Sequence, residues 1–232
     1  MKKILVSDYD DTFYLNDIDI EKNKKWVDNF RKKCNLFIIA TGRGYIDFND
    51  ALTKYNFNYD YIILNHGTTI IDKNQNILMN YSIDQKIIPQ IIAELKPKNR
   101  ILYFYDDLTE NTEYLENKNV SKINLRYDSK DMALKDSKIV NAKYKKYLNA
   151  YPVPINDVEI ISNITNKAKA IYFIADKEQI ANSNIYTIGN GHNDIEMIKE
   201  FNGYSMEKST DELKKKAIGE VASVSELIKK II

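Results

Sequence analysis

The chain has 232 residues, 44% of them hydrophobic and 29% charged, a composition that predicts a globular fold with a substantial core. Its 34 Lys and Arg residues nearly balance its 33 Asp and Glu residues, so no net field draws it to nucleic acid or to an anionic membrane. The single cysteine, Cys34, cannot form an internal disulfide, and no apolar run approaches a membrane span of roughly 20 residues, so we expect a cytoplasmic protein. We also expect a monomer or a small homo-oligomer.

The first third of the sequence alternates strand-like and helix-like segments. Continuous apolar runs at residues 4–6, 36–40 and 61–64 predict strands, and the amphipathic segment 19–33 predicts a helix. Because these runs do not alternate with polar residues, they indicate a parallel sheet that is covered on both faces. The last third resumes the rhythm, with a helix at 167–180, a strand at 185–188, a helix through 201, a short strand near 204–206 and helices from 211 and 225.

The middle third has a different pattern. Runs at 77–83, 101–105 and 121–127 place polar residues on one side, between helical segments at 84–95 and 131–148. This alternation predicts a mixed or antiparallel sheet with helices on one face. We therefore expect an α/β fold with a doubly wound parallel sheet at residues 1–80 and 158–232. A smaller α/β domain would be inserted at 81–157, and Pro152 and Pro154 would mark the return crossing.

Three groups of polar residues stand where predicted strands end. They are Asp8, Asp10 and Asp11 after the first strand, Thr41 after the second, and the loop 189–194 after a late strand. Ligand sites of open parallel sheets lie at the carboxyl ends of the strands, so these groups should meet at one edge. Carboxylates crowded this closely repel, and a hard divalent cation with oxygen ligands relieves the repulsion. Asp11 reads as a turn or capping residue.

These motifs resemble those of a known family. "DYDDT", "IIATGR", a lysine that opens a late helix and "GNGHND" are similar to the four motifs of the haloacid dehalogenase superfamily. The insertion between the second and third motifs resembles the α/β cap domain of its Cof-like branch of sugar phosphatases. The likeness spans essentially the whole chain, and the order and spacing of the motifs make it specific.

The resemblance implies a role for each matching residue. Asp8 would be the nucleophile that becomes an aspartyl-phosphate, and Asp10 would act as general acid and then general base. Thr41 and Lys167 would contact the transferring phosphoryl group. Gly42 and Arg43 belong to the same predicted phosphate-binding turn, where Arg43 either faces the site or pairs with a surface carboxylate. The ligands of Mg²⁺ would be the Asp8 carboxylate, the Asp10 carbonyl oxygen and the loop residues Asn190 and Asp194.

Two positions depart from the family pattern. Lys167 is followed by Ala168 where the family has glycine, which leaves Lys169 as an alternative for the motif lysine. Asn190 stands where the family usually has aspartate, so it can offer Mg²⁺ a carbonyl oxygen but no charge. We expect weaker Mg²⁺ affinity than an aspartate would give. Neither histidine has partners at zinc-site spacing; His66 is expected to border the substrate pocket and His192 to shape the metal loop.

The expected function is Mg²⁺-dependent hydrolysis of a small phosphate monoester, such as a sugar phosphate or a related metabolite, through an aspartyl-phosphate. The inserted domain would close over the substrate and exclude bulk water. Two alternatives stay open. One is a phosphomutase on the same scaffold. The other is a catalytically silent regulatory protein that binds phosphometabolites, which Asn190 favours and the presence of both Asp8 and Asp10 disfavours.

Overall fold

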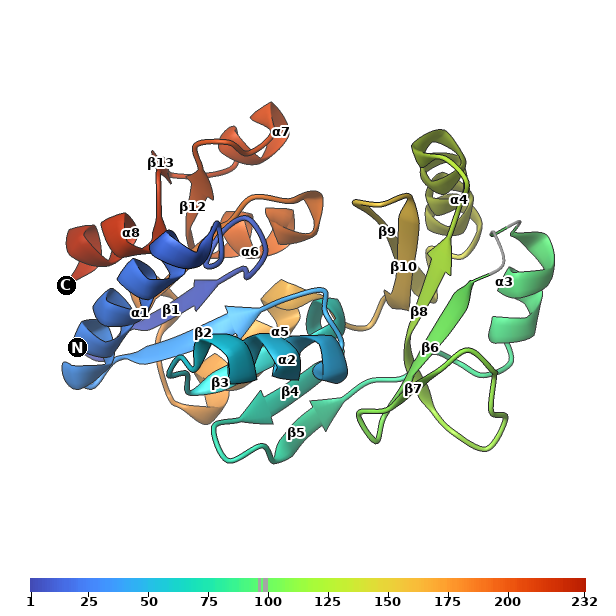
Figure 1. The fold of residues 1–232 in the computed structure, drawn as a ribbon, viewed down its shortest axis with the longest axis horizontal. Helices are drawn as coiled ribbons and strands as arrows, with labels where there is room; N and C mark the ends of the chain where they lie inside the picture. Colours follow the sequence, from blue (N-terminus) through green and yellow to red (C-terminus); the bar gives the residue numbers. More distant parts are fainter. Residues whose placement is uncertain (96, 98–99) are drawn as a thin grey trace.

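Two β-sheets organise the computed structural model, which describes residues 1–95, 97 and 100–232 (Figure 1). The larger sheet has the order β13-β12-β11-β1-β2-β3-β4-β5; β13 to β3 are parallel, and β4 and β5 are antiparallel additions at one edge. This arrangement confirms the parallel sheet expected from the unalternated apolar runs. The strands are β1 (Ile4–Ser7), β2 (Leu36–Ala40), β3 (Tyr61–Leu64), β4 (Thr69–Asp72), β5 (Ile77–Asn80), β11 (Ile185–Gly189), β12 (Asn202–Met206) and β13 (Gly219–Val221).

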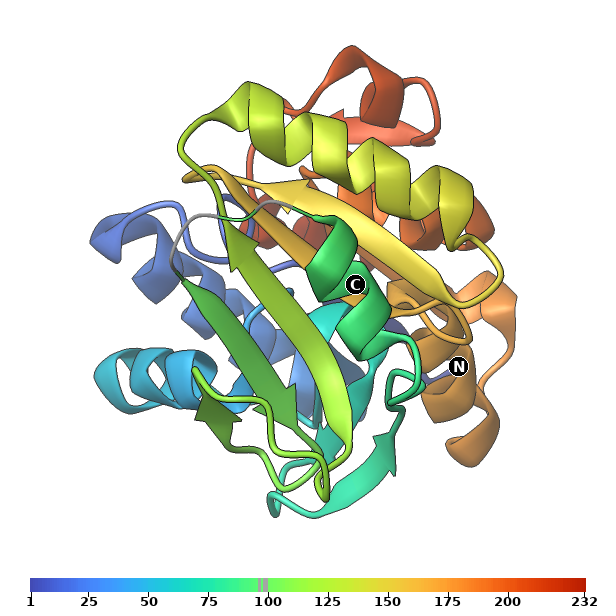
Figure 2. The same ribbon diagram turned by 90° about the vertical axis from the view of Figure 1, so that its right-hand side faces the viewer.

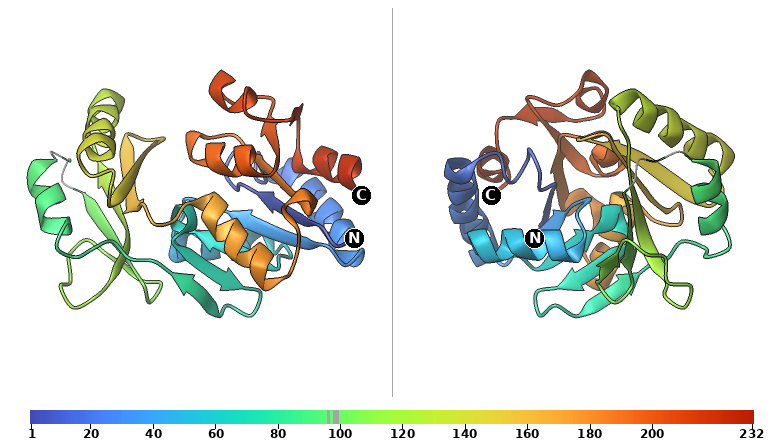
Figure 3. Two further views of the ribbon diagram at one scale, coloured as in Figure 1. Left: turned by 180° about the vertical axis from the view of Figure 1, so that it is seen from behind. Right: turned by 45° about the vertical axis from the view of Figure 1, so that its right-hand side comes forward.

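Helices cover both faces of this sheet, as a doubly wound fold requires. On one face, α1, α2 and α8 pack with Leu5 of β1; on the other, α5, α6 and α7 pack with Ile4 and Val6 (Figure 3). Neighbouring residues of β1 thus enter opposite cores, which explains why the run is apolar throughout. The helices are α1 (Asp17–Lys32), α2 (Tyr45–Tyr55), α5 (Lys167–Lys177), α6 (Ile195–Glu200), α7 (Asp211–Lys214) and α8 (Val224–Ile231), with 3₁₀ turns η1 (Asn65–Gly67), η2 (Asn182–Asn184) and η3 (His192–Asp194).

The smaller sheet is antiparallel and has the order β7-β6-β8-β10-β9. Its apolar face, which includes Ile123 and Ile160, packs against two helices in front of it (Figure 2). The opposite face carries polar side chains and is turned toward the carboxyl ends of the parallel strands (Figure 1). Its elements are β6 (Ile101–Tyr105), β7 (Glu110–Asn111), β8 (Val120–Arg126), β9 (Leu148–Val153), β10 (Asp157–Ser162), α3 (Ile88–Glu94) and α4 (Lys130–Lys143).

The structure corrects several sequence-based expectations at the junction of the two sheets. The run at 77–83 was grouped with the middle third by its pattern, but its strand β5 pairs with the unpredicted β4 in the larger sheet and ends at Asn80, the boundary expected for the core. The helix expected at 131–148 ends at Lys143, because Leu148–Val153 forms the edge strand β9. Pro152 lies in that edge strand, where its missing N–H is tolerated, and β10 keeps the chain in the smaller sheet up to Ser162, beyond the boundary expected near 158.

Local signals explain one helix boundary that lies earlier than expected. The first helix begins at Asp17, two residues before the predicted start, because the Asn16 side chain accepts hydrogen bonds from the backbone N–H groups of Ile18 and Asp19, both at 3.0 Å.

Within the described part of the chain, no helix is both long and apolar enough to cross a membrane.

Candidate active site

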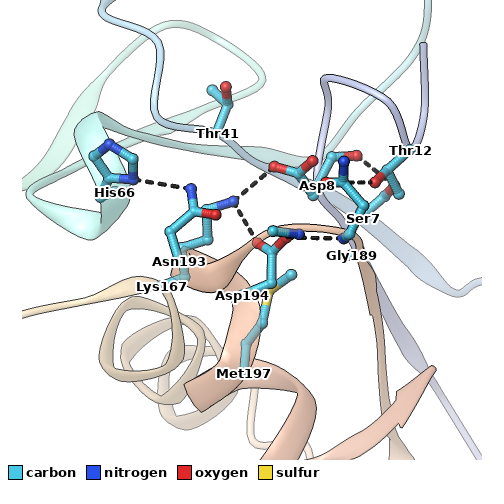
Figure 4. A network of polar contacts seen from close by, with 12 residues as sticks. Ser7, Asp8, Thr12, Thr41, His66, Lys167, Gly189, Asn193, Asp194 and Met197 are labelled. Carbon is cyan, nitrogen blue, oxygen red and sulfur yellow. Dashed lines mark hydrogen bonds and ion pairs between the residues drawn. The ribbon is translucent and has the colours of Figure 1, made fainter. Parts of the chain in front are cut away.

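The carboxyl ends of three adjacent strands bring the predicted site residues to one edge of the larger sheet. β1 lies between β2 and β11, with Ser7 opposite Ile39 on one side and Ile188 on the other. Asp8, Thr41 and the loop after Gly189 follow directly on these strands (Figure 4). The convergence expected from the parallel sheet is therefore present.

A buried lysine joins two of the carboxylates. Lys167 Nζ lies 2.7 Å from Oδ1 of Asp8 and 2.6 Å from Oδ1 of Asp194. The three side chains are only 1%, 8% and 0% exposed, so their charges interact with little screening by water. When both carboxyl groups are ionised, they leave an excess of one negative charge over the ammonium, which an added cation can neutralise.

The start of helix α5 places Lys167 at this point. Asn166 caps the helix by accepting a hydrogen bond from the backbone N–H of Lys169 (2.9 Å). The preceding Thr165 hydroxyl donates to the Gly67 carbonyl (2.8 Å), and a Cβ on Gly67 would lie 2.3 Å from the Asn166 backbone. Only glycine permits this approach, and Gly67 also has φ of +111°. The side chain of Lys169 instead contacts backbone carbonyls away from the site, so the structure brings Lys167, not Lys169, to Asp8.

The loop after β11 folds around Asp194. Oδ2 of Asp194 accepts hydrogen bonds from the backbone N–H groups of Asn190 (3.0 Å) and Gly191 (2.9 Å), while Oδ1 holds Lys167. Both oxygens of Asp194 are thus engaged by the protein. Oδ1 accepts one hydrogen bond and keeps a lone pair, so direct metal ligation by Asp194 stays a prediction.

Burial and neighbouring charge set the ionisation of this cluster. Burial, followed by the charge of Asp194, raises the pKa of Asp8 to about 7, against the opposing effect of Lys167. Burial disfavours the charged form of Lys167, but the charges of Asp194 and Asp8 outweigh it and raise the pKa of Lys167 above its usual value. A cation next to Asp8 would favour its carboxylate form.

Asp10 and Arg43 pair with each other beside the site. Arg43 donates from Nε to Oδ2 (2.9 Å) and from NH2 to Oδ1 (2.6 Å) of Asp10, and its guanidinium lies 5.1 Å from the centre of the Tyr9 ring. Both positions considered for Arg43 apply, because it pairs with a carboxylate, that of Asp10, and also lines the cavity at the site. Asp10 is half-exposed and directs its side chain to Arg43, while Asp8, two residues earlier, faces Lys167.

Thr41 and Gly42 occupy the turn after β2. The Thr41 hydroxyl oxygen accepts a hydrogen bond from the Arg43 backbone N–H (3.1 Å), which leaves its proton for a ligand. The Gly42 carbonyl accepts a hydrogen bond from Lys122 of β8 (2.7 Å), so this turn touches the smaller sheet. Asp11, as expected, lies in an exposed turn and has φ of +55°.

A cavity of about 630 Å³ lies between the two sheets and opens onto Asp8. The larger sheet contributes Asp10, Arg43 and Asn190 to its wall, and the smaller sheet contributes Tyr151 and Glu159. The cavity is large enough for a small metabolite and is bounded on both sides by polar groups.

The donor atoms around Asp8 suit Mg²⁺, which binds oxygen ligands and usually keeps several waters. Lys167 bonds to Oδ1 of Asp8, so Oδ2 can serve a cation, and Asn190 Oδ1 receives only a long hydrogen bond from Thr12 (3.4 Å). Among the described residues, no group of three or more His, Cys, Asp or Glu side chains could hold a metal ion. Two features of the site explain this result. The Asp10 carboxylate is paired with Arg43, and residue 190 is an asparagine, whose side chain is an uncharged amide.

Several residues at the site were not identified from the sequence. Lys122 and Glu159 come from the smaller sheet and are buried, and Asn193 bonds to His66, which does border the cavity as expected. Both stand at polar positions of strands that alternate apolar and polar residues, a pattern that indicates a solvent-facing side. The sequence therefore contains no sign that they are buried, which charged side chains rarely are unless paired.

Comparison with known proteins supports the resemblance. The model of the haloacid dehalogenase-like hydrolase family matches residues 5–109 and 103–226. A protein of Mycoplasma capricolum with no assigned function is 29% identical, covering 87% of this chain and 88% of its own length. A putative phosphatase of Buchnera aphidicola is 25% identical, covering 85% and 83%. The crystal structure of a putative HAD/COF-like hydrolase from Plasmodium vivax has a TM-score of 0.82 at 20% identity, with 99% of this chain and 95% of that one covered.

The fold and the site define an α/β protein whose parallel sheet has helices on both faces and whose carboxylate–lysine cluster lies beneath an inserted sheet, and the family model is that of a hydrolase. The chain belongs to the haloacid dehalogenase-like hydrolases.

Proposed function

We propose that the protein is a phosphatase that hydrolyses small phosphate monoesters with Mg²⁺, through an aspartyl-phosphate on Asp8. The observation that carries the proposal is the buried Asp8 carboxylate, held by Lys167 at the floor of the cavity. Membership of the hydrolase family and the similarity to a putative phosphatase support it. The smaller sheet, with α3 and α4, would be the cap domain.

The proposed chemistry has two displacements at phosphorus. An oxygen of Asp8 forms a bond to phosphorus as the bond to the ester oxygen breaks, and Asp10 gives its proton to that oxygen. Water then attacks the phosphorus, its proton passes to Asp10, and the bond to Asp8 breaks to release inorganic phosphate. For this role the Asp10 side chain must leave Arg43 and turn toward the reacting oxygen. Lys167 and the Thr41 hydroxyl would stabilise the charge of the transferring group.

Mg²⁺ would be held by Asp8 Oδ2, the Asp10 carbonyl oxygen and Asn190 Oδ1, with water and substrate completing its ligands. When bound, it supplies positive charge to the phosphoryl oxygens. Asp194 would orient Lys167 and the loop that carries Asn190, because its two oxygens are bonded to them.

The proposed substrates are phosphorylated metabolites of the size of a sugar phosphate. The cavity volume of about 630 Å³ fits such a molecule, and its polar walls suit hydroxyl groups. Closure of the cap domain over the substrate would exclude bulk water from the aspartyl-phosphate until the hydrolytic water attacks.

The test is phosphate release from p-nitrophenyl phosphate with Mg²⁺, with Asp8→Asn as the control, followed by a panel of phosphorylated metabolites. We expect release by the wild type and none by the variant. A phosphomutase would instead return an isomer of the substrate. The missing charge at Asn190 favours a second candidate, a regulatory protein that binds phosphometabolites. That reading would be established by binding without turnover of any compound.

A further inference from the structure

Three buried ionisable side chains connect the cap domain to the parallel-sheet core. Lys122 and Glu159 come from β8 and β10, and His66 comes from the turn η1 after β3; they are 1%, 8% and 1% exposed. Lys122 Nζ donates to Glu159 Oε1 (2.5 Å) and to the Gly42 carbonyl (2.7 Å), and Glu159 Oε2 pairs with His66 Nε2. Both oxygens of Glu159 are therefore bonded at the contact between the two domains.

The other side of the His66 ring faces the loop of the site. Nδ1 of His66 lies 3.1 Å from Nδ2 of Asn193, the residue before Asp194 (Figure 4). Because an amide nitrogen only donates, Nδ1 accepts, and the ring proton sits on Nε2, facing Glu159. The ring of Tyr151 from β9 stacks on His66 with centroids 4.7 Å apart. His66 thus spans the distance between the cap domain and the loop.

The backbone of His66 is also unusual. It has φ of +57° and ψ of +20°, a left-handed conformation that costs a residue with a Cβ about 1 kcal/mol. Such a conformation persists where the side chain makes compensating contacts, and here these are the contacts with Glu159, Asn193 and Tyr151. Burial, together with the charges of Lys122 and Lys167, lowers the pKa of His66 against the effect of Glu159, which keeps the ring neutral.

We propose that His66 is a positioning residue that links Glu159 of the cap domain to Asn193. When the cap domain is docked on the core, this link holds the Asn193 amide at the phosphoryl site. The inference rests on the proposed phosphatase function. Asn193 lines the same cavity as Asp8, and its second amide N–H can donate to a phosphoryl oxygen. Without the bridge, the amide can rotate, and the site loses a donor held in place.

The experiment measures binding of inorganic phosphate to the full-length protein with Mg²⁺ by calorimetry, beside kcat/KM for p-nitrophenyl phosphate. His66→Gly relieves the backbone strain and removes the bridge. We expect it to weaken phosphate binding about tenfold, and to have less than about a twofold effect in an Asn193→Ala background. His66→Asn tolerates the same backbone but is too short to reach both partners, so it should weaken binding like His66→Gly.

Glu159→Gln tests the cap side of the bridge. It should weaken phosphate binding in the wild type and have little further effect in His66→Gly. The matched control is Asp107→Asn, which neutralises a cap carboxylate that also pairs with a lysine, Lys118, but lies outside the cavity; it should change nothing. Circular dichroism establishes that each variant is folded.

The outcomes separate the inference from the proposed function. If the wild type binds and releases phosphate but the effects of His66→Gly and Asn193→Ala are additive, or His66→Asn binds like the wild type, the positioning role is overturned. If the wild type neither binds phosphate nor turns over any phosphate ester, both the proposed function and this inference are refuted.

Discussion

Replacing Lys167 with methionine tests the electrostatics of the site most sharply. The substitution keeps most of the side-chain volume but removes the cation between Asp8 and Asp194, whose carboxylates stay buried. Removal of one partner from a buried ion pair costs about 3–5 kcal/mol, because it leaves the other charge uncompensated. We therefore expect Lys167→Met to lose about 3–5 kcal/mol of the free energy of unfolding at pH 8 without Mg²⁺, and to lose catalytic activity.

The loss should depend on pH in a defined direction. The pKa of Asp8 is already raised from 3.8 to about 7, first by burial and then by Asp194, and removal of Lys167 can only raise it further. A carboxyl group whose pKa is higher in the folded than in the unfolded state makes the fold less stable as the pH rises. The loss begins near the pKa of the unfolded state and continues through the pKa of the folded state. The deficit of Lys167→Met relative to the wild type should therefore be larger at pH 8 than at pH 5.

Urea denaturation in EDTA at both pH values measures this deficit. Lys169→Met is the matched control, because Lys169 lies two residues later on the same helix and its ammonium donates to two backbone carbonyls away from the site. It should leave stability and activity close to those of the wild type. Equal losses for the two variants, or a deficit of Lys167→Met that is no larger at pH 8 than at pH 5, would refute the reasoning.

Three further predictions concern the acid, the metal loop and the turn after β2. Asp10→Asn should lower kcat/KM, which reports the transfer to Asp8, by about a hundredfold or more for a sugar phosphate but far less for p-nitrophenyl phosphate, whose leaving group needs no proton; equal losses of kcat/KM for the two substrates would exclude the acid role. Asn190→Asp should lower the Mg²⁺ concentration needed for half-maximal activity, and an unchanged Mg²⁺ titration would count against a ligand at this position. In Gly42→Ala the new Cβ would lie 2.5 Å from His66 Cε1, so thermal or urea unfolding should show a loss of about 1–3 kcal/mol, whereas Gly219→Ala, at 3.1 Å from a Tyr204 ring carbon, should lose less.

Continuous apolar runs made the parallel core predictable, because a strand buried on both faces carries mostly apolar residues. Ile4, Leu5 and Val6 satisfy this condition, and the structure places them in two different cores. The edge of the sheet was harder to predict. Strands β4 and β5 form a short hairpin at the rim of the larger sheet. The sequence of β9 resembles the end of a helix followed by prolines, which an edge strand tolerates because its backbone pairs with one neighbouring strand only.

Some residues of the site could be predicted from the sequence and others could not. Asp8 and Asp194 could be predicted from their places after strands, and Lys167 from the family motif with Lys169 as the alternative; the structure joins Asp8, Lys167 and Asp194 in one cluster. The contact between Arg43 and Asp10 could not, because it joins two loops that are distant in sequence. The group of Lys122, Glu159 and His66 could not, because it depends on how the smaller sheet sits on the larger one. Sequence periodicity describes single elements and carries no information on that placement.

The covalent step at Asp8 is the central claim, and trapping it is the most direct test. The enzyme is mixed with a phosphate ester and Mg²⁺, quenched in acid, reduced with borohydride and digested for mass spectrometry. An aspartyl-phosphate is reduced to homoserine, and the account predicts this change at position 8 of the wild type and its absence in Asp8→Asn. Phosphate release with no modification at Asp8, or with the modification at another carboxylate, would contradict it.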